Sequence, residues 1–285
     1  MFRSTALFLL VLSSACTNKP DPADDSSATD DSVAMSPVFP SGASSWTGTA
    51  EISGATLNGT AELTRTAGTV EGTVSLDFNG SNLSFTLLGT IDDQSGQLAM
   101  LPVAWVGADP GLGLVGLTAV YDPAANTLTG LVRDVQSWDS PTVDGGPLSF
   151  STTTPAELVE SSTLTTPPVL GETPMNYSGT FQCSTDVRPV RGSLSRGSDG
   201  QVEGTISWDE ADGSYVGVFP VVGAEDAATG NLTLLPQPWL EEVSETRNYK
   251  NFFVHGTVTP EGYTGTLSQD VGMVCFADQF QVLFD

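Results

Sequence analysis

The chain contains a single histidine, His255, the only side-chain type whose ordinary pKa suits proton transfer near pH 7. Val254 and Val258 share the inner face of an expected strand, which turns His255 outward. A general base without a second functional group nearby is a poor catalyst. The chain also has no Gly-x-Ser-x-Gly nucleophile motif, phosphate-binding loop or dinucleotide-binding fingerprint. These observations favour a non-catalytic protein that uses no cofactor.

Carboxylates are the abundant alternative, since the chain has 34 Asp and Glu residues. Asp209, Glu210 and Asp212 form the densest acidic cluster outside the N-terminal segment, and they offer oxygen ligands of the kind that Ca²⁺ prefers. One hairpin supplies about three of the six to eight ligands that Ca²⁺ needs, so a solvated acidic turn is the simpler interpretation. Asp92–Asp93 and Glu225–Asp226 lie at equivalent turns, where hairpin chemistry explains them. Two carboxylates roughly 5 to 10 Å apart would instead make a glycan hydrolase.

The first sixteen residues have the order of an export signal. They comprise the positive Arg3, the short apolar run Ala6–Leu12, the small residues Ser13–Ala15 and then Cys16. This order resembles a bacterial lipoprotein signal peptide with its lipobox, although Ser13 stands where that family prefers leucine. The apolar run is far shorter than the roughly 20 residues that a spanning helix needs.

The resemblance implies that residues 1–15 are a cleaved signal peptide and that Cys16 carries a diacylglycerol thioether. The protein would then be held in the cell envelope by its lipid anchor. An aspartate after the cysteine tends to retain Gram-negative lipoproteins at the inner membrane. Thr17 stands there instead, which resembles lipoproteins sent to the outer membrane.

Lipidation of Cys16 would leave Cys183 and Cys275 as a pair in an exported protein, where a disulfide is expected. Neither cysteine lies in a CxxC or Cys/His cluster, so the sequence gives no support for a zinc site. Residues 16–44 are rich in Pro, Ser and paired aspartates and lack apolar periodicity, which predicts a disordered acidic linker. A net charge of −25 with nine basic residues argues against a nucleic-acid partner.

Beyond residue 45 the chain repeats itself. Trp46–Thr49 returns as Tyr177–Thr180 and Val70–Ser75 returns as Val202–Ser207. The run from Ser95 to Trp105 also returns between Thr229 and Trp239, and Leu148–Phe150 matches Val282–Phe284. The offsets, 131 to 134 residues, keep the same order, which indicates a tandem duplication. We expect β domains at 45–153 and 175–285, joined by a linker at 154–174.

Each copy predicts about eight short antiparallel strands separated by turn residues. The expected ranges are 46–52, 59–65, 69–77, 82–92, 96–105, 113–121, 127–133 and 147–152, then 177–183, 190–195, 201–208, 214–222, 230–235, 251–258, 262–268 and 278–284. An up-and-down barrel would remove exposed edges and bring Cys183 near Cys275. The opening aromatic residue followed by Gly-Thr looks like the first strand of calycin barrels, the lipocalins and avidins. A β-sandwich is the alternative.

Trp105 and Trp239 follow equivalent Leu-Pro pairs near strand ends. They could form an aromatic lip at a barrel mouth that stacks on a sugar or an apolar ligand. Alternatively, they plug the end of the barrel as core residues. The sequence thus predicts a cell-envelope lipoprotein that acts as a binding or scaffolding module for a small molecule, a glycan or a protein. A carboxylate-based glycan hydrolase and a purely structural envelope component are the other hypotheses.

Overall fold

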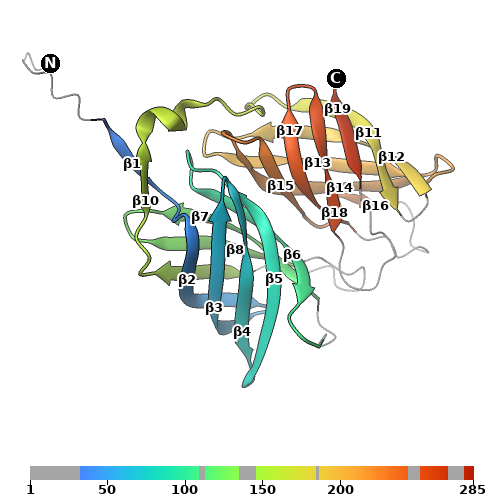
Figure 1. Cartoon of the computed structure of the whole chain (residues 1–285). Coiled ribbons are helices and arrows are strands. Elements are labelled where there is room, and N and C mark those ends of the chain that lie inside the picture. Colours follow the sequence, from blue (N-terminus) through green and yellow to red (C-terminus); the bar gives the residue numbers. More distant parts are fainter. Residues whose placement is uncertain (1–32, 109–112, 135–145, 184–185, 243–250, 269–278) are drawn as a thin grey trace, which may run out of the picture. The chain divides into compact units, whose positions relative to one another are not determined.

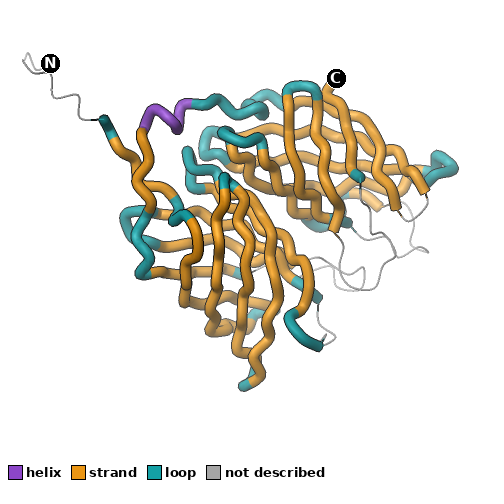
Figure 2. The backbone as a smooth tube through the Cα atoms, viewed as in Figure 1, coloured by secondary structure: helices purple, strands orange, loops and turns teal. Residues whose placement is uncertain are grey.

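A computed structural model describes residues 33–108, 113–134, 146–183, 186–242, 251–268 and 279–285. Most of these residues form β-strands, and one short 3₁₀ helix, η1 (Ser161–Thr165), lies between the two sets of strands along the sequence (Figure 2). Among the described residues, no helix has the length and apolar character needed to cross a bilayer.

The first copy forms a closed barrel of eight antiparallel strands (Figure 1). The strands are β2 (Gly42–Ile52), β3 (Ala55–Thr66), β4 (Thr69–Phe78), β5 (Ser81–Ile91), β6 (Gln97–Trp105), β7 (Val115–Asp122), β8 (Thr127–Asp134) and β9 (Pro147–Thr152). Each strand pairs with the next along the chain, and β9 pairs back onto β2 from Trp46 opposite Thr152 to Ala50 opposite Leu148. This last ladder leaves the barrel without a free sheet edge.

The second copy closes in the same way. Its strands are β11 (Met175–Cys183), β12 (Asp186–Arg196), β13 (Gln201–Asp209), β14 (Tyr215–Asp226), β15 (Asn231–Pro236), β17 (Phe253–Thr259), β18 (Gly262–Ser268) and β19 (Phe280–Phe284). The ladders β13–β14 and β11–β19 complete the ring. The short β16 (Glu241–Glu242) adds to the edge of β14.

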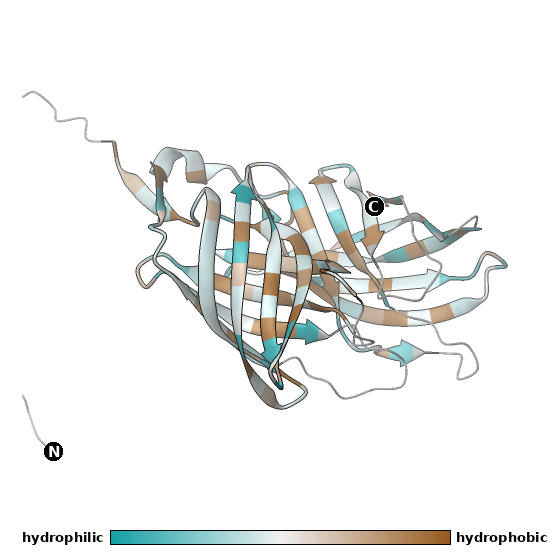
Figure 3. Cartoon of the chain, turned by 60° about the horizontal axis from the view of Figure 1, so that its bottom comes forward, coloured by the Kyte–Doolittle hydropathy of each residue, from teal (hydrophilic) through white to brown (hydrophobic). Residues whose placement is uncertain are grey.

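The predicted barrel is therefore confirmed for both copies, and the sandwich alternative is wrong because the first and last strands pair. All sixteen expected strands are present, with ends displaced by at most four residues. The alternation of apolar and polar residues along each strand explains why the expected and observed strand ranges agree. Val70, Val74 and Leu76 of β4 are buried in the first core, while Glu71 is exposed to solvent. Figure 3 shows the same alternation of apolar and polar residues along the strands.

Three strands lie outside the expected ranges: β16 and two strands near the start and middle of the chain. β1 (Met35–Val38) pairs with β10 (Glu157–Glu160) in a separate two-stranded sheet (Figure 1). Val38 and Phe39 are almost fully buried, and so is Leu170 near the end of the predicted linker. The prediction of disorder is therefore wrong for residues 35–44, which include β1 and the start of β2, and residues 154–174 are an ordered connection that packs on the barrels.

Close strand contacts at glycines fix how the two copies correspond. A Cβ on Gly48 would lie 2.0 Å from the carbonyl oxygen of Ser149, and one on Gly179 would lie 2.1 Å from that of Gln281. Gly48 is opposite Phe150, whereas Gly179 is opposite Val282. Phe150 therefore corresponds to Val282. The sequence match of Leu148–Phe150 with Val282–Phe284 is wrong by two residues, because short apolar strands look alike in either register.

Candidate functional site

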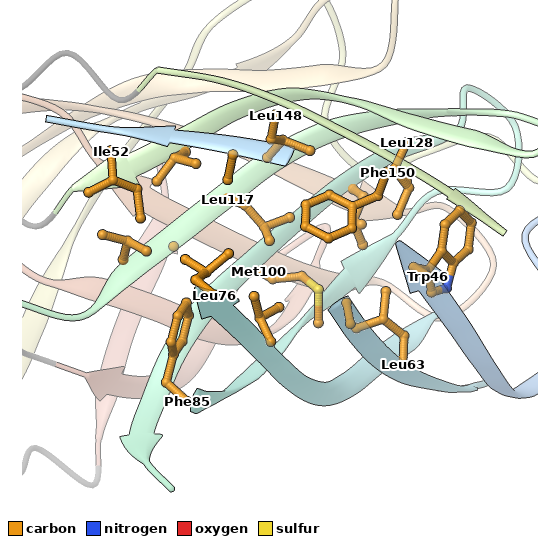
Figure 4. A pocket seen from close by; sticks show the side chains of 17 residues that line it. Trp46, Ile52, Leu63, Leu76, Phe85, Met100, Leu117, Leu128, Leu148 and Phe150 are labelled. Atoms are coloured by element: carbon orange, nitrogen blue, oxygen red, sulfur yellow. The ribbon is translucent and has the colours of Figure 1, made fainter. Parts of the chain in front are cut away.

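The interior of the first barrel is narrow and apolar. It retains a cavity of about 30 Å³, lined by side chains that include Leu63, Met100, Leu128 and Phe150. Figure 4 shows Trp46 at one end of this cavity and Ile52, Leu76 and Phe85 at the other. The middle of the barrel is thus close to fully packed, and any larger ligand would have to bind at an end.

The end at Trp46 is closed by aromatic rings. Trp46 is fully buried and stacks on Phe39, with ring centroids 5.4 Å apart. Tyr121 meets Phe39 and Trp46 edge-on, at 5.2 Å and 6.0 Å. The indole Nε1–H donates to Ser44 Oγ at 2.8 Å, which satisfies the one polar group of the ring.

The opposite end, which we call the first mouth, contains a cavity of about 210 Å³. Its lining is mostly apolar and consists of Ile52, Ser53, Leu57, Leu76, Phe78, Leu83, Phe85, Trp105, Gly113 and Val115. Ile52, Leu76, Phe85 and Val115 also line the interior cavity, so the two spaces adjoin. The first mouth is therefore an apolar pocket leading toward the barrel interior.

Trp105 lines this mouth. Its ring meets Phe85 edge-on, with centroids 5.6 Å apart. Trp239 repeats this contact with Phe219 at 5.0 Å in the second barrel. Both tryptophans are partly buried, so each combines core packing with some exposure.

The second barrel carries larger side chains at positions where the first barrel is hollow. Ala50 corresponds to Phe181 by the register of the first strand, and Leu76 corresponds to Trp208 by the repeat around β4 and β13. Val115 corresponds to Phe252, because Leu117 and Val254 pair with equivalent residues of the preceding strands. The ring of Phe181 packs against Trp208 and Phe252, with centroids 5.5 Å and 5.1 Å apart.

Charged groups also lie at the equivalent end of the second barrel, which we call the second mouth. Arg188 and Glu210 stand where the first barrel has Leu57 and Phe78. The Arg188 guanidinium lies 5.1 Å from the centroid of the Trp208 ring and 3.2 Å from a carboxylate oxygen of Glu210. A cation over an indole face is attracted by the ring quadrupole. Among the described residues, the first mouth therefore has an apolar lining, whereas the equivalent positions of the second barrel carry larger rings and charged groups.

The calcium candidate falls within this charged region. Glu210 pairs with Arg188, and Asp209 pairs with Arg191 at 2.7 Å. Asp212 accepts hydrogen bonds from the backbone N–H and the hydroxyl of Ser214. The described residues contain no group of three or more potential metal ligands. Arginines and turn capping thus occupy the carboxylates that the sequence offered to a cation.

The outer faces of β5 and β6 pack on those of β14, β15 and β17, in a contact that we call the seam. Its apolar cluster is Ala99, Leu101, Ala224, Leu235 and Phe253. Next to it, the Thr90 hydroxyl bonds that of Thr233 at 2.8 Å, and Thr233 bonds His255 Nδ1 at 2.8 Å. Burial lowers the pKa of His255. The histidine is on the outer face of its strand, as predicted, but it packs within the seam.

The two sides of the seam are nearly equivalent by the duplication. Gln97 Nε2 donates to the carbonyl of Asp199, while its counterpart Asn231 donates through Nδ2 to Thr69 Oγ1. Thr90 corresponds to Ala224 and Thr233 to Ala99. The position equivalent to the hydrogen-bonded threonine pair is therefore occupied by two buried alanines. The seam is a pseudo-two-fold contact in which this polar pair is one departure from symmetry.

The paired acids of the two equivalent turns lie along the seam, where hairpin chemistry explains only part of their role. Asp92 caps its own turn and is also bound by Arg196, with the carboxylate fully buried. Asp93 is bound by Arg65, which corresponds to Arg196 in the duplication. Glu225 accepts the backbone N–H groups of Val169 at 2.6 Å and Leu170 at 3.1 Å, so it holds the connection between the barrels.

Burial sets the protonation of these acids. It raises the pKa of Asp93 from 3.8 to about 6, although Arg65 opposes the shift and Asp226 and Asp92 add to it. Burial also raises the pKa of Glu225, against the opposing N–H groups of Val169 and Leu170. Because the native pKa of Asp93 exceeds the unfolded value, its titration lowers stability as pH rises from about 4 to about 6.

Asp92 and Asp93 also line a cavity of about 130 Å³ beside Pro37–Phe39 and Tyr121. An acid pair at one cavity, with one raised pKa, is what a carboxylate hydrolase requires. However, the Asp92 side chain has no exposed surface and is held by Arg196, so it cannot contact a substrate. The described residues thus give this cavity one accessible carboxylate rather than two.

The remaining sequence candidates lie outside the described side chains. Cys16 and Cys275 fall in undescribed segments, and only the backbone of Cys183, the last residue of β11, is described. The disulfide and the lipid anchor stay predictions. No protein-family model matches the chain, and neither a curated protein nor a solved structure matches it.

Proposed function

We propose that this protein is a non-catalytic ligand-binding module of the cell envelope, in which the first barrel binds a small apolar molecule at its mouth. The observation that carries this proposal is the apolar cavity of about 210 Å³ at Trp105, in a position where the second barrel carries the larger ring of Trp208 and the charged Arg188. The second barrel would then support the first through the seam.

The size and lining of the cavity favour a compact ligand. An engineered apolar cavity of about 150 Å³ stays dry and binds benzene. The first mouth is somewhat larger, which suits one ring with a short substituent. Ligand sites are typically apolar clefts with a few polar groups, and this description fits the lining from Leu57 to Trp105.

Isothermal titration calorimetry with isopropylbenzene tests the proposal. We expect saturable binding to the wild-type protein and at least a tenfold weaker affinity for Leu76→Trp, because that change introduces the ring present at Trp208. Asn58→Trp is the matched control, since it adds the same ring to an exposed position on β3. Absence of binding to wild type would instead support a purely structural component.

The envelope location rests on the resemblance of the N-terminus to a lipoprotein signal, and on the acidic segment after Cys16 that would serve as a tether. A Cys16→Ser variant is expected to lose the lipid and to appear in the soluble fraction or to stay unprocessed. Detergent phase partitioning of cell fractions measures this. Normal processing with unchanged partition into detergent would contradict the anchor.

A further inference from the structure

The second mouth holds a cation of the chain itself against an aromatic ring. The Arg188 guanidinium lies 5.1 Å from the centroid of the Trp208 ring and 3.2 Å from a carboxylate oxygen of Glu210. The Arg188 side chain is only 16% exposed. A ring attracts a cation more strongly where water is excluded. One of the two duplicated mouths is therefore stabilised by a cation on an aromatic side chain.

The first mouth has aromatic side chains but no cation. Leu57 stands at the position of Arg188, and the described lining contains no Lys, Arg or His. Phe78, Phe85 and Trp105 line the cavity of about 210 Å³ at this end of the barrel. A positive charge in this cavity would therefore have to come from a ligand.

Negative charge near the first mouth favours such a ligand. Glu51 immediately precedes the lining residue Ile52, and Asp77 immediately precedes Phe78. Neither acid forms an ion pair in the described part of the chain. Neighbouring residues are about 3.8 Å apart, well within the Debye length of about 8 Å at physiological ionic strength. Together with a net charge of −25, these acids attract a cation to the mouth and repel an anion.

The lining also restricts the kind of cation. An ammonium that carries N–H groups needs acceptors, because burying a polar group without a hydrogen bond is costly. Ser53 has the one side-chain oxygen of the described lining. A quaternary ammonium has no N–H group and presents only carbon substituents, which suits a wall of aliphatic and aromatic side chains.

We propose that the first mouth binds an organic cation that combines a quaternary ammonium with an apolar body about the size of one ring. This inference rests on the proposed function, because it specifies the ligand class of the same cavity. The ammonium lies among the aromatic side chains, as Arg188 does in the second mouth. The apolar body lies against the aliphatic side chains of the same cavity.

Phenyltrimethylammonium and tert-butylbenzene provide a matched pair of probes, since they have the same shape and only the first is charged. We expect calorimetry on the full chain to show about tenfold tighter binding of phenyltrimethylammonium. Added salt should weaken the binding of this cation and leave tert-butylbenzene unaffected. Binding of tert-butylbenzene that is as tight as that of the cation would overturn the inference.

Removing the two acids tests their contribution. The double change Glu51→Gln with Asp77→Asn should weaken phenyltrimethylammonium about fivefold more than tert-butylbenzene, as expected for two partly screened charges. Asn retains the oxygen that accepts the Gly80 N–H. Glu71→Gln with Glu261→Gln is the matched control, because it removes the same charge roughly 16 Å along β4 from Leu76 and in the second barrel. An equal effect of both double variants would overturn the role of the acids at the mouth.

The outcomes separate the two proposals. If neither probe binds the wild-type protein, the proposed function fails. If tert-butylbenzene binds and phenyltrimethylammonium does not, the mouth binds apolar molecules as proposed, and its preference for a cation is refuted.

Discussion

Arg196→Met is expected to lower the free energy of unfolding by about 3–5 kcal/mol at pH 7.5. Asp92 has no exposed surface, and Arg196 is the cation that binds it. Removing one partner of a buried ion pair leaves an uncompensated charge in a medium of low dielectric constant. Urea denaturation followed by tryptophan fluorescence measures the change. A loss below about 1 kcal/mol would mean that the pair contributes no more than an exposed ion pair.

Arg65→Met is the matched control from the other copy. Its partner Asp93 has a pKa raised to about 6, so this acid can take up a proton when its cation is lost. Below that pH the neutral acid no longer needs Arg65, and the part of the loss due to Asp93 should fall as pH is lowered from 7.5 to 5. The bonds of Arg65 to Phe39 and Glu157 leave a remainder at every pH. A loss independent of pH would contradict this account.

Trp46→Ala should destabilise the first barrel by about 3–5 kcal/mol, because it deletes the ring that closes one end of the core. Phe39 and Tyr121 would each lose the ring contact with Trp46, and the narrow interior would open toward that end. Trp105→Ala is the comparison, since its ring is partly exposed and should cost less. Thermal unfolding by calorimetry ranks the two variants, and an equal loss would refute the role of Trp46 as an end plug.

Much of the fold follows from two patterns that a single sequence contains. Period-two alternation, as in Val70 to Leu76, identifies strands because the buried face must be apolar. The duplication then provides each strand twice, at offsets of 131 to 134 residues. The sequence does not predict the two-stranded sheet of Met35–Val38 and Glu157–Glu160. Strands of four residues are too short for a period-two alternation of apolar and polar residues to be detected.

The contrast between the two mouths is also visible in the sequence once the copies are aligned by strand register. Comparing inward positions of the copies sets Leu57 against Arg188 and Leu76 against Trp208, which predicts that one mouth is apolar and the other charged. The seam was harder to predict. Its threonines and acids occupy outward positions that look solvated, and only the packing of one barrel on the other reveals that they are buried.

The unequal polar pair in the seam has a consequence for self-recognition. If two first barrels from different chains met through this face, each Thr90 would lie against Ala99 and its buried hydroxyl would lose the partner that Thr233 provides. A buried hydroxyl left without a partner costs about 1–3 kcal/mol, and such a pairing would incur that cost twice. The polar pair therefore disfavours contact between identical barrels of different chains relative to the contact between unlike barrels within one chain.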